Sequence, residues 1–510
     1  MRLPGVVLYS DILNRRVFAE FFDAGGEAIM KIKAVFVAFL VAASLFAEEY
    51  FPRNYGGIDP AAVMAFVDAV DAVGVPMHSF LFIKDGEVVA EGAWSPYTPN
   101  ELTALYSLTK PMVSIAAGFA IQEGKISLDD PVIKFFPDDL PAELPAGVAD
   151  IKFRHLLSMT SGHDEKDLDE QWGDSKSYIQ NFFSIPLAHE PGTNYIYGFT
   201  SDIAAKTIAR AVGMPLADYL QPRLFEPLGI TEYSWSRDKD GDYRGGSGLS
   251  LALEDIGKVG VFCLQSGMWE GKQLLNAEWF DLATQKHADV PWTNPDWKEY
   301  GLHLWRDTAG NFRGDGWGGQ LMIMMREENA VLVISESTFY MAQIVYNIAY
   351  HTLSHGALGK YVARKEVSPV ELAERLAKLT LPVAESTAKP ALPERFTINV
   401  ETAEDAPAAS WEFEISADGV TATQHGMKLF HHLDGDKKFY PHHSWAAYAD
   451  GNNRLWARSA WIAPDELILY LYANPIQTSL TFKFTDDKVT VTPGFYGDAP
   501  FTGTIEPVTE

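Results

Sequence analysis

Three segments of the chain place a serine three residues before a lysine, a spacing suited to nucleophilic catalysis. The three pairs are Ser107 with Lys110, Ser236 with Lys239 and Ser386 with Lys389. On a helix, three residues bring both side chains to one face, so the lysine amine can reach the serine hydroxyl. The amine accepts the hydroxyl proton only when it is neutral, and burial together with the positive helix N-terminus lowers its pKa toward that state. A buried pair of this kind is a candidate nucleophile and base.

The sequence around each pair separates the three. Ser236 lies in an aspartate-rich turn and Ser386 in a proline-rich segment, so both are expected to be exposed to solvent. Ser107 alone follows an apolar pair and opens an amphipathic stretch, 111–122, that is typical of a helix. We therefore predict Ser107 as the nucleophile and Lys110 as its base. The alternative, a surface serine and lysine on an ordinary helix, is the more frequent meaning of the spacing alone.

The segment Ser107-Leu-Thr-Lys-Pro111 resembles the nucleophile motif of serine β-lactamases, D-alanyl-D-alanine peptidases and their esterase relatives. Further segments that resemble this family's motifs follow in the expected order, at 125–131, 154–162, 191–193 and 224–229. The similarity covers about residues 60–350, and several separated motifs in order are far more specific than one tetrapeptide. The resemblance implies a β-lactamase/transpeptidase-like domain and a two-step acyl transfer through Ser107.

The family's second motif, Tyr-x-Asn, is represented here by Tyr197-Gly198-Phe199. The resemblance gives the Tyr197 phenol the role of passing protons between nucleophile and leaving group. The asparagine is absent, and with it an amide that would hold a β-lactam side chain or help to fix the lysine. A half-buried core tyrosine is an equally ordinary role for Tyr197, and Tyr195 is the rival position. The place of Tyr197 just before an expected helix at 201–212 favours the catalytic interpretation.

The third motif is usually Lys-Thr-Gly or His-x-Gly, and the matching segment here is Trp317-Gly318-Gly319, followed by Gln320. This segment resembles the third motif of family VIII carboxylesterases. A lysine or histidine there pairs with a substrate carboxylate, whereas an indole offers an apolar wall. The resemblance assigns oxyanion binding to the backbone N–H groups of Ser107 and Gln320, and the two glycines allow the backbone to approach the substrate. The alternative is a flexible strand entry with a packing tryptophan.

The composition favours a large, folded and acidic protein. Of its 510 residues, 47% are apolar and 21% are charged, and the formal net charge is −27, so nucleic acid and anionic lipid surfaces are unfavourable partners. A neutral or cationic small molecule is the expected partner. The chain has one cysteine, Cys263, in an apolar run. It therefore forms no intramolecular disulfide, and we expect it to be a small core residue.

The N-terminal region has the pattern of a secretory signal. Two lysines after Met30 precede an apolar run at 34–46, and Ala47 precedes two glutamates. The run is too short to span a bilayer permanently. We expect residues 1–47 to comprise an upstream extension and a signal peptide, and the protein to be exported to the periplasm or the extracellular space. The alternative is a true extension with a buried helix at 34–46, and Leu45 at the −3 position leaves the cleavage site open.

The remaining pattern predicts two domains. Residues 50–375 mix helical periodicity with two strand pairs, near 80–90 and 321–334, which favours an α+β fold around an antiparallel sheet. Residues 376–392 are proline-rich and are expected to form a linker. Residues 393–510 alternate apolar and polar side chains between turns, which predicts a small all-β domain, either a sandwich or a barrel.

Two other patterns are weaker candidates for function. The C-terminal region carries five histidines, but neighbours on a strand point to opposite faces and do not readily share a metal; they are His425, His431, His432, His442 and His443. The segment Asp238-Lys-Asp-Gly-Asp242 resembles a calcium loop, but Leu249 occupies the place of the closing glutamate, so we expect a turn. The sequence contains neither a Gly-x-Ser-x-Gly elbow nor a phosphate-binding loop. We expect no metal and no cofactor.

These patterns lead to a serine hydrolase acting most readily on short-chain esters. Within the same fold the alternatives are a β-lactamase, a D-alanyl-D-alanine peptidase or a hydrolase of short amide oligomers. The alternative from another class is a non-catalytic binding protein on a degenerate hydrolase fold, with the C-terminal domain as its working part. The sequence leaves the natural substrate and the oligomeric state open.

Overall fold

The computed structural model describes residues 50–95, 97–164, 177–291, 298–307, 310–337, 342–353 and 366–381, together with strands between 395 and 507. By its contacts the chain divides into two units, Met1–Tyr50 and Phe51–Glu510, and every described residue except Tyr50 belongs to the second. The expected signal segment, 1–47, lies outside the described residues, as do residues 382–394 around the expected linker.

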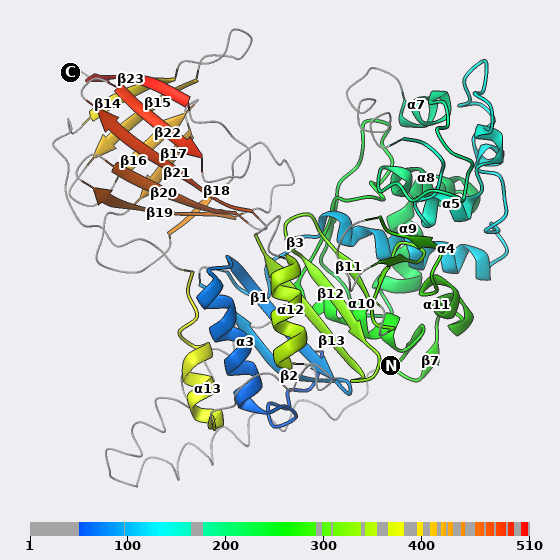
Figure 1. Ribbon diagram of the computed structural model, residues 1–510, viewed down its shortest axis with the longest axis horizontal. Coiled ribbons are helices and arrows are strands. Elements are labelled where there is room, and N and C mark those ends of the chain that lie inside the picture. Colours follow the sequence, from blue (N-terminus) through cyan, green and yellow to red (C-terminus); the bar gives the residue numbers. More distant parts are fainter. Residues whose placement is uncertain are drawn as a thin grey trace, which may run out of the picture. The chain divides into compact units, whose positions relative to one another are not determined.

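An antiparallel sheet of eight strands is the framework of the part between residues 50 and 381, as the sequence predicts (Figure 1). Its strand order is β2-β1-β13-β12-β11-β10-β9-β8. The predicted hairpin near 80–90 is β1 and β2, joined by Asp85 and Gly86, both with positive φ. In the order of the sheet, the strands are Glu87–Ala93, Met77–Lys84, Ala330–Glu336, Leu321–Met325, Phe312–Asp315, Trp305–Arg306, Glu299–Tyr300 and Ala288–Asp289.

Helices cover both faces of this sheet, and β13 is therefore buried along its whole length. Side chains of a strand alternate between its faces, so Val331 packs in the core on the side of α10 (Leu253–Leu264). Its neighbour Leu332 packs in the core on the side of α3 (Pro60–Val73) and α12 (Ala342–Leu353). Figure 1 shows α3 and α12 side by side on one face of the sheet. The sheet is thus a rigid, two-sided support for the residues at its edge.

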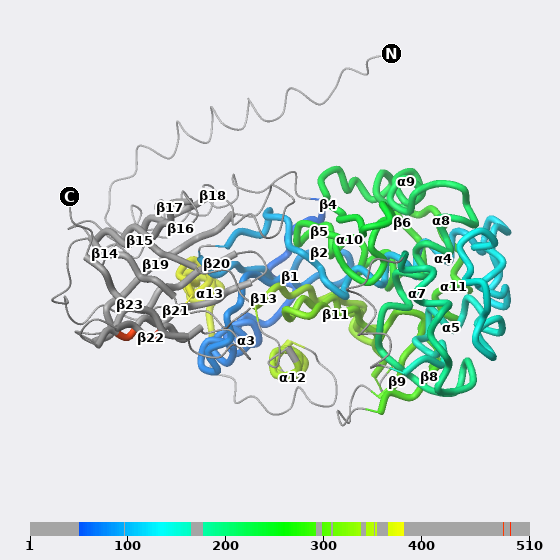
Figure 2. Tube along the Cα trace, turned by 90° about the horizontal axis from the view of Figure 1, so that it is seen from above, coloured from blue at the N-terminus to red at the C-terminus, as the bar shows by residue number. Residues whose placement is uncertain are grey.

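A second group of helices packs beyond β11, where Figure 2 shows α4, α5, α8 and α11 gathered together. The helices expected at 111–122 and 201–212 are confirmed as α4 (Lys110–Gln122) and α8 (Thr200–Val212). Among the described residues, no helix is long and apolar enough to cross a membrane. The other helical segments of this region are η2 (Val132–Phe135), η3 (Val148–Asp150), α5 (Phe153–Leu157), α7 (Tyr178–Ser184), α9 (Leu216–Leu220), η5 (Gln221–Phe225) and α11 (Ala277–Ala283).

The described part after residue 394 is a single antiparallel sheet of ten strands, in the order β17-β16-β15-β14-β23-β22-β21-β20-β19-β18. The prediction of an all-β C-terminal region is confirmed for these strands. The edge strands β17 and β18 are in contact, so the sheet curls. In the order of the sheet, the strands are Met427–His431, Val420–Gln424, Ala409–Ile415, Arg395–Val400, Phe501–Pro507, Lys488–Pro493, Ile476–Thr485, Glu466–Ala473, Arg454–Ala463 and Tyr440–His443.

The contacts of the first sheet continue past residue 375, where the sequence predicts the first domain to end. Helix α13 (Pro369–Leu376) packs against α3. After it, the Ser95 N–H donates to the Leu379 carbonyl at 3.0 Å and the Leu381 N–H donates to the Ser95 carbonyl at 3.1 Å. Leu379 and Leu381 are both buried. The described structure therefore includes residues 376–381 in the first domain and not in a linker.

Candidate active site

Ser107 lies in a short 3-10 helix, η1 (Tyr106–Thr109), directly before α4. A strand contact holds the segment in place, because the Leu105 N–H donates to the Leu249 carbonyl at 2.8 Å. Tyr106 has a φ of 45°, an unusual value for a residue with a side chain. The turn brings Ser107 to a half-buried position at the start of the helix, where its hydroxyl faces Lys110.

Lys110 is almost fully buried and reaches back to the serine. Its Nζ donates to Ser107 Oγ at 2.8 Å and to the carbonyl of Gly246 at 2.9 Å. The same Nζ lies 4.8 Å from the ring centroid of Tyr197. The spacing of Ser107 and Lys110 in the sequence therefore corresponds to direct contact between the two reactive groups, and the buried position restricts the access of water to the amine.

Of the two candidate tyrosines, Tyr197 is the one that the structure places over Lys110. Its ring is half-buried and stacks on Trp305, with ring centroids 5.8 Å apart. Tyr195 lies instead in an aromatic core, edge-on to Tyr300 at 5.3 Å, and is nearly fully buried. Burial raises the pKa of Tyr195 well above 10, which makes it a poor proton carrier at neutral pH.

Helix α8, which follows Tyr197, holds in place the loop whose Gly246 carbonyl accepts from Lys110. Asp202, in its first turn, accepts hydrogen bonds from the N–H groups of Gly245 at 2.8 Å and Gly246 at 3.3 Å. Burial raises the pKa of Asp202, against the opposing effects of the Gly246 N–H and of nearby Lys110. The sequence pattern does not indicate this contact, because an acidic side chain in the first turn of a helix is usually explained by the helix dipole alone.

The loop that contains Gly245 and Gly246 begins near Asp238, and Lys206, one turn further along α8, binds this other end of it. Its Nζ lies 2.7 Å from Asp238, 3.3 Å from Asp240 and 2.8 Å from Asp242. Burial disfavours the charged amine, but its hydrogen bonds to Asp238 and Asp242 outweigh this effect and raise the pKa of Lys206. The expected turn at 238–242 is confirmed. The cation among its carboxylates is the ammonium group of Lys206.

The predicted third motif forms a tight turn between β11 and β12. The Gly316 N–H donates to the Gln320 carbonyl at 2.7 Å, and the Gly319 N–H donates to the Gly316 carbonyl at 3.0 Å. Gly319 has a φ of 92°, which favours glycine. A β-carbon on Gly316 would overlap the carbonyl oxygen of Leu105. The absence of that carbon lets the turn lie against the backbone just before Ser107, as a shared oxyanion site requires.

Trp317, at the tip of this turn, is 56% exposed. Its ring meets that of Tyr106 edge-on, with centroids 5.6 Å apart. The two aromatic rings come from the segments that carry the two candidate oxyanion donors, Ser107 and Gln320. An exposed aromatic pair beside a nucleophile offers apolar area to a substrate, and the indole provides no cation for a substrate carboxylate.

A buried histidine close to the site does not provide a base for Ser107. His303 Nε2 lies 3.2 Å from Ser201 Oγ, the hydroxyl at the start of α8. Burial, with a smaller contribution from the charge of Lys110, lowers the pKa of His303 to about 3. The ring is therefore neutral at physiological pH, and its hydrogen bond is directed to Ser201.

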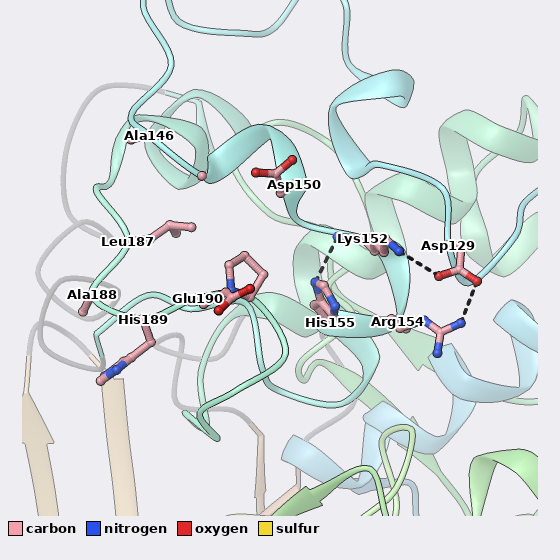
Figure 3. A pocket seen from close by; sticks show the side chains of 12 residues that line it. Asp129, Ala146, Asp150, Lys152, Arg154, His155, Leu187, Ala188, His189 and Glu190 are labelled. Carbon is pink, nitrogen blue, oxygen red and sulfur yellow. Dashed lines mark hydrogen bonds and ion pairs between the residues drawn. The ribbon is translucent and has the colours of Figure 1, made fainter.

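A separate pocket of about 710 Å³ lies between the segments around 146–155 and 187–191 (Figure 3). Its charged side chains are largely paired with one another, since Asp129 accepts from Lys152 at 3.1 Å and from Arg154 at 2.8 Å. His155 Nδ1 accepts the Lys152 N–H at 3.1 Å, and burial lowers the pKa of His155 to about 4. The lining includes none of the predicted site residues.

Comparison with known proteins gives a family match and several relatives. The family model described as Beta-lactamase matches residues 64–355, more than half of the chain. A lovastatin esterase of Penicillium rubens is 28% identical over 193 residues, which are 33% of this chain and 47% of the relative. Esterase EstB of Burkholderia gladioli is 26% identical over 204 residues, which are 34% of this chain and 52% of the relative. The chain thus spans about half the length of these curated relatives.

Among solved structures, the octameric penicillin-binding protein homologue from Pyrococcus abyssi is 19% identical to this chain, with a TM-score of 0.48. The match covers 87% of this chain and 99% of that protein.

Proposed function

The chain belongs to the beta-lactamase family, and on that premise we propose that it is a serine carboxylesterase that forms an acyl-enzyme on Ser107. The observation that carries the proposal is the contact between Lys110 Nζ and Ser107 Oγ at 2.8 Å, in a buried position beneath the ring of Tyr197. A serine hydroxyl is a weak nucleophile unless a base removes its proton. Neutral Lys110 is placed to do so.

In the proposed first step, Lys110 takes the proton of Ser107 as Oγ attacks the ester carbonyl. The carbonyl oxygen becomes an oxyanion, which the N–H groups of Ser107 and Gln320 stabilise. Each well-placed donor of this kind contributes about 10²–10³ in rate. The Tyr197 phenol relays the proton from Lys110 to the departing alcohol oxygen, which leaves the acyl group on Ser107. Water then releases the acid by the reverse proton path.

Lys110 must be neutral to act as the base of this reaction. Asp202 lies behind the loop that binds Lys110, and its Oδ1 accepts the N–H groups of Gly245 and Gly246. Burial raises the pKa of Asp202.

Two departures from the β-lactamase pattern favour an ester over a carboxylate-bearing lactam or peptide. Phe199 stands where the second motif has asparagine, and Trp317 stands where the third motif has lysine or histidine. Neither side chain forms an ion pair with a substrate carboxylate. The exposed Trp317 and its neighbour Tyr106 offer an apolar surface instead. A short, uncharged acyl or alcohol group fits this chemistry best.

The test compares turnover of p-nitrophenyl butyrate with that of a chromogenic cephalosporin. We expect the ester to be preferred by at least about 10²-fold in kcat/KM, and Ser107→Ala and Lys110→Ala each to lose about 10³-fold or more. Ser236→Ala is the matched control, because Ser236 has the same spacing to a lysine but is exposed. A faster rate on the cephalosporin would identify a β-lactamase on the same residues.

Covalent labelling separates the enzyme from a non-catalytic binding protein. A fluorophosphonate probe should add to Ser107 and to no other serine, as read by mass spectrometry of the digested protein. Lys110→Ala should slow the labelling strongly, since the probe needs the same activated oxygen. An unlabelled Ser107 in an otherwise folded protein would exclude the proposed enzyme.

We also propose that the protein is exported. The proposal rests on the sequence alone, on the basic residues and apolar run before Ala47. N-terminal sequencing of the protein recovered from the periplasm or the medium would test it. A start near Glu48 supports cleavage, and recovery of the intact chain in the cytosol contradicts it.

A further inference from the structure

A carboxylic acid that the proposed reaction does not use lies behind the third-motif turn. Glu336 is the last residue of β13 and is completely buried. Among the described residues, neither of its carboxyl oxygens has a hydrogen-bond partner. A buried polar group without a partner is costly and is rarely kept without a role.

The surroundings of Glu336 favour its un-ionised form, because no described cation faces it. On β1 the nearest titratable group is His78, whose ring nitrogens face the hydroxyls of Ser335 at 3.3 Å and Ser337 at 2.6 Å. Burial lowers the pKa of His78 to about 3, so this ring is neutral. Two strands away, Arg313 of β11 is paired with Asp315 at 3.1 Å.

The other described elements beside Glu336 contribute no charged side chain. Strand β12 and the turn 316–320 contain no titratable side chain, and on α12 the ring of Tyr346 packs in the core. Burial alone raises the pKa of Glu336 well above 4.5. Burial therefore favours the un-ionised acid.

Glu336 contacts the turn at two points. A β-carbon on Gly319 would overlap Glu336 Oε1 and would lie 2.7 Å from its Cδ, so the carboxyl group packs directly against Gly319. The backbone carbonyl of Glu336 accepts a hydrogen bond from Gln320 Nε2 at 3.2 Å, and Gln320 Oε1 accepts the Gly318 N–H at 3.2 Å. The end of β13 thus braces the turn from behind, once through its side chain and once through its main chain.

We infer that Glu336 is a positioning residue for the oxyanion site: its carboxyl group packs against Gly319 and so fixes the N–H of Gln320 relative to Ser107. This inference rests on the proposed function, since it concerns the oxyanion of that reaction. The neutral state matters because an ionised carboxylate behind the same peptide would oppose the negative charge that develops in front of it. The acid acts through Gln320 and does not touch the substrate.

The first test is the kinetics of Glu336→Ala on p-nitrophenyl butyrate. Removing the brace lets the turn relax, so we expect kcat to fall about 10–100-fold while KM changes less than about 3-fold, because an oxyanion donor acts on the transition state. Glu336→Gln keeps the shape without a charge and should recover most of the lost rate. Glu336→Asp withdraws the acid by one methylene and should lower kcat in the same direction, which keeps the test available if the alanine variant does not fold.

The second test is a double-mutant cycle with Gly319. Gly319→Ala places a methyl group in the space of the Glu336 carboxyl and should lower kcat strongly. Combining it with Glu336→Ala removes this clash, so the double variant should be faster than Gly319→Ala alone, although the positive φ keeps some strain. Additive losses, or a Glu336→Ala kcat within 2-fold of wild type, would overturn the inference.

The same experiments distinguish this inference from the proposed function. If the wild-type protein neither turns over the ester nor labels at Ser107, the proposed reaction fails and the inference fails with it. If wild type is active and Ser107→Ala is inactive, but the Glu336 variants behave like wild type, the inference alone is wrong.

Discussion

Two buried acids shape the site, and their hydrogen bonds give them different roles. Asp202 accepts two backbone N–H groups of the loop that binds Lys110, whereas no described partner meets the carboxyl of Glu336. Burial raises the pKa of both groups. Asp202 therefore acts as an acceptor that holds the backbone of Gly245 and Gly246. Glu336 acts by packing against the turn at Gly319.

The role of Asp202 can be separated into shape and charge. Asp202→Ala removes the acceptor of the Gly245 and Gly246 N–H groups, so we expect a loss of about 1–3 kcal/mol in unfolding free energy and at least a 10-fold fall in kcat as the Gly246 carbonyl leaves Lys110. Asp202→Asn keeps Oδ1 and should retain most of the stability. Urea unfolding and ester kinetics measure the two effects.

Asp255→Asn is a matched control for these variants. Asp255 is half-buried and its pKa is also raised by burial, but it pairs with Lys258 on its own helix, α10, at 2.7 Å. Its replacement should affect stability and leave kcat unchanged. Equal kcat losses at both positions would mean that Asp202 acts only through general stability.

The raised pKa of Glu336 predicts a dependence of stability on pH. The folded state keeps the proton while the unfolded state releases it near pH 4.5, so the favourable contribution is complete below that value and is lost as pH rises toward the folded pKa. Glu336→Gln does not titrate. Its stability relative to wild type should therefore grow by about 1.4 kcal/mol per pH unit above pH 5. Urea unfolding of both proteins at pH 5, 6 and 7 measures this slope, and parallel curves would show an ionised or exposed Glu336.

At the scale of elements, α8 organises the site through side chains one turn apart. Asp202 and Lys206 both hold the loop that ends at Gly246, the first by accepting backbone N–H groups and the second by pairing with three carboxylates. Tyr197 lies just before the same helix. One helix thus places Tyr197, the proposed proton relay, and by way of the loop it places the carbonyl that accepts from Lys110, the proposed base.

Lys206→Met is expected to destabilise the protein by about 3–5 kcal/mol, because it leaves the buried carboxylate of Asp238 without its cation. Arg210→Gln is the control on the same helix. Arg210 is exposed and lies 3.6 Å from Asp242, so its removal should cost less than about 1 kcal/mol. Thermal or urea unfolding of the wild type and the two variants shows whether the Lys206 ammonium group stabilises the fold. Equal stability of all three proteins would contradict this role.

Local patterns predicted the elements, whereas long-range contacts in the site could not be predicted. Ser107 and Lys110 are three residues apart, and helical geometry alone brings them together. The carbonyl that completes the surroundings of Lys110 belongs to Gly246, 136 residues further along the chain. Glu336 is a further case, because a glutamate at the end of an apolar strand usually marks the exposed end of that strand. Only the packed turn at Gly319 shows that this one is buried.

At the scale of the whole chain, the sequence predicts a first domain that ends at residue 375, whereas the described contacts of its sheet continue to Leu381. Prolines after residue 381 signalled a linker, and the composition just before them is unremarkable. The residues that close the first domain pair with Ser95, at the far end of the sequence of that domain. A pairing between residues so far apart in the sequence produces no local pattern, so the sequence does not reveal it.

This boundary can be tested with two truncated chains that begin at Tyr50. One ends at Leu381 and keeps all of the described contacts of the first domain, so we expect it to fold and to hydrolyse p-nitrophenyl butyrate with a kcat within about 3-fold of the full chain. The other ends at Glu366 and lacks α13. It exposes the surface that Leu372, Leu379 and Leu381 cover.

Burying a leucine side chain contributes about 1.5–3 kcal/mol, so the shorter chain should lose about 5 kcal/mol and unfold at a markedly lower temperature. The ion pairs of Arg375 with Asp68 and Asp71 are partly exposed and add little. Melting curves and ester rates of both chains check the expectation. Equal stability of the two would place the end of the first domain before α13, and an inactive chain ending at Leu381 would mean that the C-terminal β region is needed for catalysis.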